Sequence, residues 1–122
     1  MKVLLGMGGS DDSLTALERT VERTRVAGDD LTVAVVENPE VDASLADVES
    51  HARSVLDEAG LDAEVRCVRG DAGSRLVDIA ESEGFDCIAI GGGQRSPMGK
   101  INLGQIAQFV LLNSQVSVML VR

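Results

Sequence analysis

The sequence is poor in the residues that build metal sites and disulfide frameworks. Among its 122 residues are two cysteines, Cys67 and Cys87, one histidine, His51, and no tryptophan or tyrosine. Both cysteines lie in apolar, strand-like runs, so we expect two buried thiols and no disulfide. The lone histidine falls on a predicted helix surface and no Cys/His cluster accompanies it, which argues against a protein metal site.

Long apolar runs are also missing. No segment approaches the roughly eighteen apolar residues that a membrane span requires. The N-terminus enters a strand at residues 3–5 without the apolar region and cleavage site of a signal peptide, which predicts a cytoplasmic protein. The length predicts one domain over residues 1–122, and a hydrophobic content of 44% suffices for a buried core.

Positive charge is scarce. Lysine occurs only at Lys2 and Lys100, and 20 acidic residues against 11 Lys and Arg give a net charge of −9. This balance argues against a duplex nucleic acid as partner, because phosphate binding needs a basic face. An acidic, lysine-poor surface over a core with only two aromatic residues favours a halophilic source, in whose salt the repulsion is screened.

What the sequence does contain is a strict alternation of strand and helix patterns. Apolar runs typical of strands lie at residues 3–5, 31–36, 63–68, 86–90 and 116–121. Helical spacing of apolar residues lies at 14–27, 45–59, 71–80 and 105–113. This order predicts an α/β fold, with an open, mostly parallel five-stranded sheet and helices on both faces.

Glycine-rich segments follow the first and fourth predicted strands. They are residues 8–10 and residues 91–105, and the second joins a strand end to a helix start near Gln105. Such a junction presents backbone N–H groups to an anion, usually a phosphate, whereas a plain long turn would use glycine only for positive φ. If strands one and four are neighbours, the two segments face each other across one crevice, where ligands of such sheets bind.

The segment 91–105 is not a Walker A loop. Gly99 and Lys100 supply the Gly-Lys pair, but Gln94 stands where the first glycine is needed. Ile101 occupies the position of the Ser/Thr that binds magnesium.

The segment after strand one matches two other phosphate loops in part. Residues 6–11 place Asp11 where a dinucleotide fingerprint needs its third glycine, and the chain is too short to add a substrate domain. Residues 7–12 keep the glycines and the aspartate of the pyrophosphatase loop of AMP-forming enzymes but lack its first serine. An AMP-forming enzyme is therefore a distant alternative.

Over essentially its whole length the chain resembles the universal stress protein family. The adenine-nucleotide loop of that family, G-x2-G-x9-G-[ST], lies between strand four and helix four. Anchored on Gly104, the motif places Gly91 at its first glycine. Its second glycine falls on Gln94, next to Gly93, and its final Ser/Thr falls on Gln105.

Further segments carry the same resemblance. Arg95-Ser96 matches the common Arg-Ser of the family loop, and residues 93–100 resemble loops of haloarchaeal members. Gly8-Gly9-Ser10 resembles the Asp-Gly-Ser after strand one, with Gly8 in place of the acid. Residues 116–122 resemble the last strand of the family, which pairs with a second subunit.

The resemblance implies an adenine nucleotide alpha hydrolase-like sheet of strand order 3-2-1-4-5. It also implies a homodimeric stress-response protein that binds ATP, ADP or AMP, with or without Mg²⁺, between strands one and four and acts as a sensor or regulator. No catalytic residue and no reaction are expected. The residues assigned to the nucleotide are Gly6, Gly8, Val36, Ile90, Gly91, Gly93, Gln94, Arg95, Ser96, Gly104, Gln105 and Ile106.

The last strand gives its own reason to expect a dimer. Val116, Val118 and Leu120 form one face of a strand at the end of the chain. An apolar edge without Lys or Pro can pair with a second copy, unless a helix covers it.

Three positions depart from the family pattern. Gly8 has no side chain for the nucleoside, and Gln94 and Gln105 stand at positions that contact phosphate. These departures favour an alternative, a homodimeric interaction or structural protein that no longer binds a nucleotide. Arg95 and Lys100 could still offer positive charge to a phosphate.

Overall fold

Five parallel strands form the sheet of this α/β protein, whose computed structural model describes residues 1–92, 94–95, 98 and 101–122. The strand order is β3-β2-β1-β4-β7. The strands are β1 (Lys2–Met7), β2 (Asp30–Val36), β3 (Glu64–Val68), β4 (Cys87–Gly91) and β7 (Ser117–Val121). Both the predicted fold class and the predicted order 3-2-1-4-5 are confirmed, with β7 as the fifth strand.

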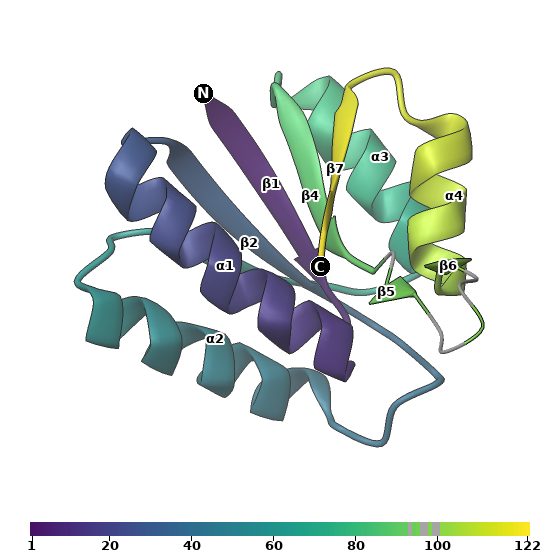
Figure 1. Cartoon of the computed structure of the whole chain (residues 1–122), viewed down its shortest axis with the longest axis horizontal. Helices are drawn as coiled ribbons and strands as arrows, with labels where there is room; N and C mark the ends of the chain where they lie inside the picture. Colours follow the sequence, from purple (N-terminus) through teal and green to yellow (C-terminus); the bar gives the residue numbers. More distant parts are fainter. Residues whose placement is uncertain (93, 96–97, 99–100) are drawn as a thin grey trace.

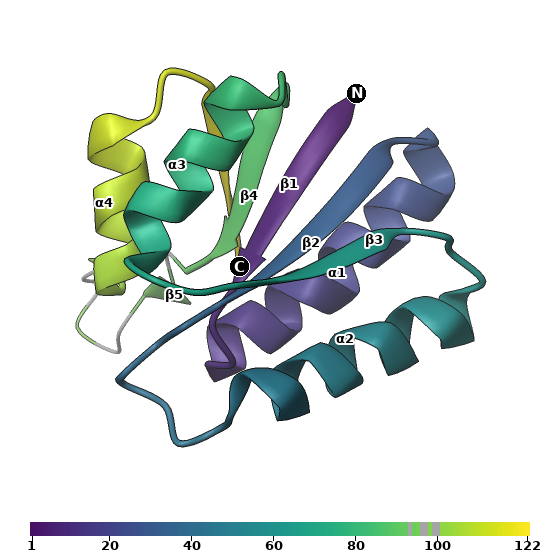
Figure 2. The same cartoon turned by 180° about the vertical axis from the view of Figure 1, so that it is seen from behind.

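Four helices cover the sheet, two on each face. They are α1 (Asp11–Ala27), α2 (Leu45–Ala59), α3 (Ala72–Ser82) and α4 (Gln105–Asn113). Helices α1 and α2 lie over one face (Figure 1), and the reverse view shows α3 and α4 on the other (Figure 2). The helices change from one face of the sheet to the other after β3, because the chain then returns past β2 and β1 to add β4 on the other side of β1.

The helix boundaries follow local chemistry that the sequence displays. The Ser10 hydroxyl accepts a hydrogen bond from the Ser13 N–H at 3.2 Å and caps α1. Gly28 and Gly60 end α1 and α2 in the left-handed conformation, with φ of 73° and 69°, which glycine adopts without a Cβ penalty. His51 lies exposed on α2, as predicted.

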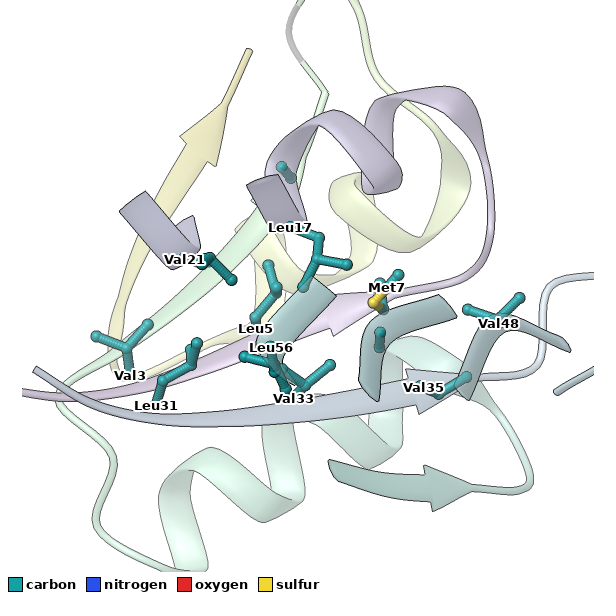
Figure 3. Close-up of a cluster of buried hydrophobic side chains, with 13 residues drawn as sticks. Val3, Leu5, Met7, Leu17, Val21, Leu31, Val33, Val35, Val48 and Leu56 are labelled. Atoms are coloured by element: carbon teal, nitrogen blue, oxygen red, sulfur yellow. The ribbon is translucent and has the colours of Figure 1, made fainter. Parts of the chain in front are cut away.

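Alternation along β1 divides the core into two layers. Val3, Leu5 and Met7 point toward α1 and α2 and are buried in the first cluster (Figure 3). Leu4 points to the other face, where it packs with Leu76 of α3 in the second cluster. Since a fully buried side chain of this kind contributes about 1.5–3 kcal/mol, the two layers hold β1 firmly at the centre of the sheet.

The prediction of two buried thiols is half wrong. Cys87 is buried in β4, whereas Cys67 is exposed on β3. Strand β3 is an edge strand, and the Cys67 thiol lies beside Glu49 of α2. Desolvation contributes most to raising the pKa of both thiols, and the Glu49 carboxylate raises the pKa of Cys67 further.

The predicted loop between β4 and α4 contains a short antiparallel pair of strands. These strands are β5 (Gln94–Arg95) and β6 (Ile101–Asn102), with Gln94 opposite Asn102. Strands of two residues are too short to show the alternation by which a sequence indicates a strand.

Candidate functional site

Strands β1 and β4 are neighbours, and their carboxyl ends meet. They pair in parallel, with Gly6 opposite Ile90 near the ends of both strands. The chain also changes sheet face at this point, which is where open α/β sheets form a crevice. The segment 8–10 and the described ends of the segment 91–105, at Gly91 and Gly104, therefore lie at the same edge of the sheet.

A small cavity of about 190 Å³ lies between these strand ends. Every predicted nucleotide residue whose side chain the structure describes lines it: Gly6, Gly8, Val36, Ile90, Gly91, Gly104, Gln105 and Ile106. The structure describes Gln94 and Arg95 by their backbone only, in β5. Gly93, Ser96 and Lys100 lie outside the described residues.

Gly91 brings α1 directly against the end of β4. A Cβ atom at this position would lie 2.4 Å from the carbonyl oxygen of Asp12 and 3.0 Å from the backbone nitrogen of Ser13. Real Cβ atoms do not approach backbone this closely, so only glycine allows the contact. The first turn of α1 reaches the cavity for this reason, and Ser10, Asp12 and Ser13 line it.

Gly104 has no such packing requirement. Its φ is −68°, which any residue adopts, and no described atom lies within 4 Å of the position of a Cβ. Gly104 is the N-cap of α4, and no side chain accepts a hydrogen bond there. The missing Cβ therefore leaves the first N–H groups of α4 accessible beside the small cavity.

A larger cavity of about 860 Å³ adjoins the small one. The two share six lining residues: Gly8, Val36, Asn38, Pro39, Gln105 and Ile106. Its apolar lining comes from the end of β2, the segment that leads into α2, the start of α3 and one face of α4: Val36, Pro39, Ala43, Leu45, Ala46, Val48, Ala72, Ile106 and Phe109. Sequence reasoning placed only Val36 and Ile106 of these at the site.

Phe109 and Asn38 are the main lining residues that sequence reasoning missed. The Phe109 ring packs against α3, where a Cβ at Gly73 would lie 2.6 Å from a ring carbon. A glycine inside a helical pattern is the one sequence signal of such a close approach. Asn38 could have been found as the polar residue that follows the strand next to strand one.

Charged side chains stand at the rim of the larger cavity. Arg69 Nη1 and Glu37 Oε1 are 3.5 Å apart, and the Arg69 side chain is 79% exposed, so this ion pair adds little stability. The Asp71 carboxylate accepts from the Ser74 N–H at 3.2 Å and thereby caps α3. Among the described lining residues of both cavities, Arg69 is the one cation.

Within the described ranges, no three His, Cys, Asp or Glu side chains gather closely enough to hold a metal ion. None of the helices that the structure describes combines the length and apolar character of a membrane span.

Solved structures of similar fold all cover nearly the whole chain. A universal stress protein from Archaeoglobus fulgidus is 23% identical, with 100% of this chain and 98% of that chain covered and a TM-score of 0.77. A universal stress protein in complex with cAMP is 26% identical, with coverage of 98% and 94% and a TM-score of 0.74. A universal stress protein from Archaeoglobus fulgidus in complex with dAMP is 18% identical, with coverage of 100% and 98% and a TM-score of 0.73.

The sequence comparisons are of two kinds. No curated protein matches this sequence. The model of the Universal stress protein family, in contrast, matches residues 1–122. Since that match spans the entire chain and the fold agrees with solved members, the protein belongs to the universal stress protein family.

Proposed function

We propose that this protein binds an adenine nucleotide in the two adjoining cavities and acts as a regulator or sensor in a stress response. One observation carries the proposal. The predicted residues from β1, β4 and the start of α4 converge on a cavity at two helix N-termini, and this cavity adjoins a larger one that has both apolar and charged side chains in its lining. Such a pair of compartments suits a ligand with an anionic end and an apolar end.

The sizes and linings of the two cavities favour a particular placement of the phosphate and the base of a nucleotide. Pockets for small molecules measure about 300–1,000 Å³, so the cavity of about 190 Å³ is too small for a whole nucleotide. It suits the phosphate, because helix N-termini carry partial positive charge and free N–H donors. The cavity of about 860 Å³ has the apolar lining and the Phe109 ring that suit a purine base.

Two relatives support the choice of ligand class. Their solved structures contain cAMP and dAMP, which are both adenine nucleotides with one phosphate. AMP is therefore the first ligand to test on this chain, ahead of ATP with Mg²⁺.

The alternative function is a homodimeric interaction protein without nucleotide. Gly8 favours it, because a buried glycine offers the nucleoside no side chain. Gln105 favours it as well, because its amide replaces the hydroxyl that the family motif places next to the phosphate.

Calorimetric titration and thermal melting in high salt test the proposal. AMP should raise the melting temperature, since a ligand at 100 times its Kd stabilises the folded state by about 2.7 kcal/mol. Gly104→Ala should not lower the melting temperature of the free protein, but it should lose most of the shift, because its methyl group would stand beside the first N–H groups of α4. The absence of any shift with millimolar AMP, ADP or ATP would refute nucleotide binding.

Mass spectrometry of small molecules released from the purified protein gives an independent result. An adenine nucleotide recovered in stoichiometric amount would refute the alternative. Protein that is free of nucleotide and also fails to bind in the titration would favour the interaction function.

A further inference from the structure

Asn38 occupies the space beside Gly8. A Cβ atom at Gly8 would lie 2.9 Å from the Asn38 Cβ and 3.0 Å from its Nδ2. Gly8 is the position at which the family resemblance implies an acid that contacts the nucleoside. In this chain, a side chain at position 8 and Asn38 in its present place exclude each other sterically.

The Asn38 amide is held in one orientation. Its Oδ1 accepts a hydrogen bond from the Glu40 N–H at 3.0 Å, and its backbone carbonyl accepts from the Val41 N–H at 3.3 Å. These bonds form a turn directly after β2 that fixes the oxygen end of the amide. The Nδ2 group finds no hydrogen-bond acceptor in the part of the chain that the structure describes.

The position of Asn38 relates this free donor to a ligand. Asn38 is half-buried and lines both cavities. In the division of the nucleotide given above, the sugar lies where the phosphate compartment meets the base compartment. Because the described side-chain hydrogen bond of Asn38 uses only Oδ1, its Nδ2 is available to a ligand acceptor at this place.

We infer that Asn38 orients the bound nucleoside by donating a hydrogen bond from Nδ2 to a ligand acceptor at the junction of the cavities. This inference rests on the proposed nucleotide-binding function. In this role the neutral Asn38 amide, which follows the neighbouring strand β2, donates a hydrogen bond where the family pattern has a negatively charged acceptor at position 8. The protein would then recognise an oxygen or nitrogen acceptor of the nucleoside and place no carboxylate at position 8 near the phosphate.

Asn38→Asp separates this role from a role in the turn. An aspartate keeps the shape of the side chain and the oxygen that accepts from the Glu40 N–H, but it loses the Nδ2 donor. Calorimetric titration with adenosine and with AMP, in high salt, measures the consequence. We expect about fivefold to tenfold weaker binding of adenosine, as for one lost hydrogen bond, and an unchanged melting temperature of the free protein.

Comparison of adenosine with AMP separates the loss of the Nδ2 hydrogen bond from repulsion between the new carboxylate and the phosphate. Repulsion by the new carboxylate alone would weaken AMP and leave adenosine unaffected, because adenosine has no phosphate. That result, or full affinity for both ligands, would overturn the role of Asn38. If the wild-type protein binds neither ligand, the proposed function itself is refuted and this inference with it.

A swap of the two positions covers the case in which Asn38→Asp disturbs folding. Asn38→Gly should lose adenosine affinity. The double variant Gly8→Asn/Asn38→Gly restores an amide donor to the crevice from β1 without the clash, and it should regain most of the affinity. A loss of turn structure would not be repaired from position 8, so equal weakness of the single and double variants would overturn the proposal.

Discussion

Gly91 and Gly104 are the first and last glycines of one sequence motif, yet they differ in physical role. Gly91 is needed because the backbone of Asp12 lies within 2.4 Å of the position of its missing Cβ. Gly104 has ordinary backbone angles and open space around it. The first glycine therefore builds the crevice, whereas the last one leaves it accessible.

Gly91→Ala should destabilise the protein, because the new methyl group must push α1 away from the end of β4. Overpacking of this kind costs about 1–3 kcal/mol, which urea denaturation measures. Gly104→Ala is the matched control. It should be neutral or stabilising by about 0.4–1 kcal/mol, since alanine restricts the unfolded chain. Equal loss of stability in both variants would contradict the different roles of these glycines.

Glu83 gives the stability a dependence on acid pH. Arg66 Nη1 and Nη2 donate to the two Glu83 oxygens at 2.6 and 2.7 Å, and this contact holds the pKa of Glu83 below its usual range. A lowered folded-state pKa stabilises the fold above the ordinary glutamate pKa of about 4.3. That contribution is lost as the pH falls through the folded-state value.

Glu83→Gln should therefore flatten the fall in melting temperature as the pH is lowered from neutral to about 3. Glu58→Gln is the control, because Glu58 is exposed and makes no ion pair within the described residues. An unchanged acid profile in Glu83→Gln would show that the ion pair contributes nothing to the folded state.

At the level of elements, side-chain caps set where three of the four helices begin. The Ser44 hydroxyl accepts from the Asp47 N–H at 3.1 Å and caps α2, as Ser10 and Asp71 do for α1 and α3. Helix α4 begins at Gly104 without a side-chain cap. The N-termini of α1 and α4 both line the small cavity, and of these two α4 is the helix without a side-chain cap.

Two serines of α2 allow a matched test of capping. Ser44→Ala should lower the free energy of unfolding by about 0.5–2 kcal/mol, because one N–H loses its acceptor. Ser54→Ala lies on the exposed face of the same helix and should be neutral or slightly stabilising, since alanine has the higher helix propensity. Chemical denaturation compares them, and an equal change in both would exclude the cap as the cause.

For the whole molecule, β7 leaves one sheet edge open to a second copy. Among the strands that the structure describes, β4 is its one partner, and β7 begins at Ser117, one residue later than predicted. Val116, Val118 and Leu120 are half-buried against the second core cluster. The homodimer through this strand stays a prediction.

Val118→Lys should convert the dimer to monomers, because a charge on the paired edge opposes strand association, while the aliphatic stem keeps packing against the second core cluster. Light scattering after size-exclusion chromatography measures the mass. Leu112→Lys, on a side chain of α4 that is 84% exposed, should leave the dimer intact. A monomeric wild-type protein would contradict the dimer prediction directly.

The net charge of −9 predicts a salt requirement for the entire fold. At about 0.1 M ionic strength the screening length is about 10 Å, so like charges across this small protein still repel. The melting temperature should rise with KCl concentration. Full stability in low-salt buffer would count against a halophilic source.

Sequence alone was sufficient to predict the order of strands and helices, most of their boundaries and the family. These properties depend on local periodicity, caps and glycine stops, which neighbouring residues display directly. Tertiary structure was needed to place Asn38 beside Gly8, Asp12 against Gly91 and Phe109 over the larger cavity. Each of these contacts joins segments far apart in the chain, and its distance depends on how strands and helices pack. The glycine-rich segments could be recognised as half of a site from sequence, but the remainder of that site was decided by packing.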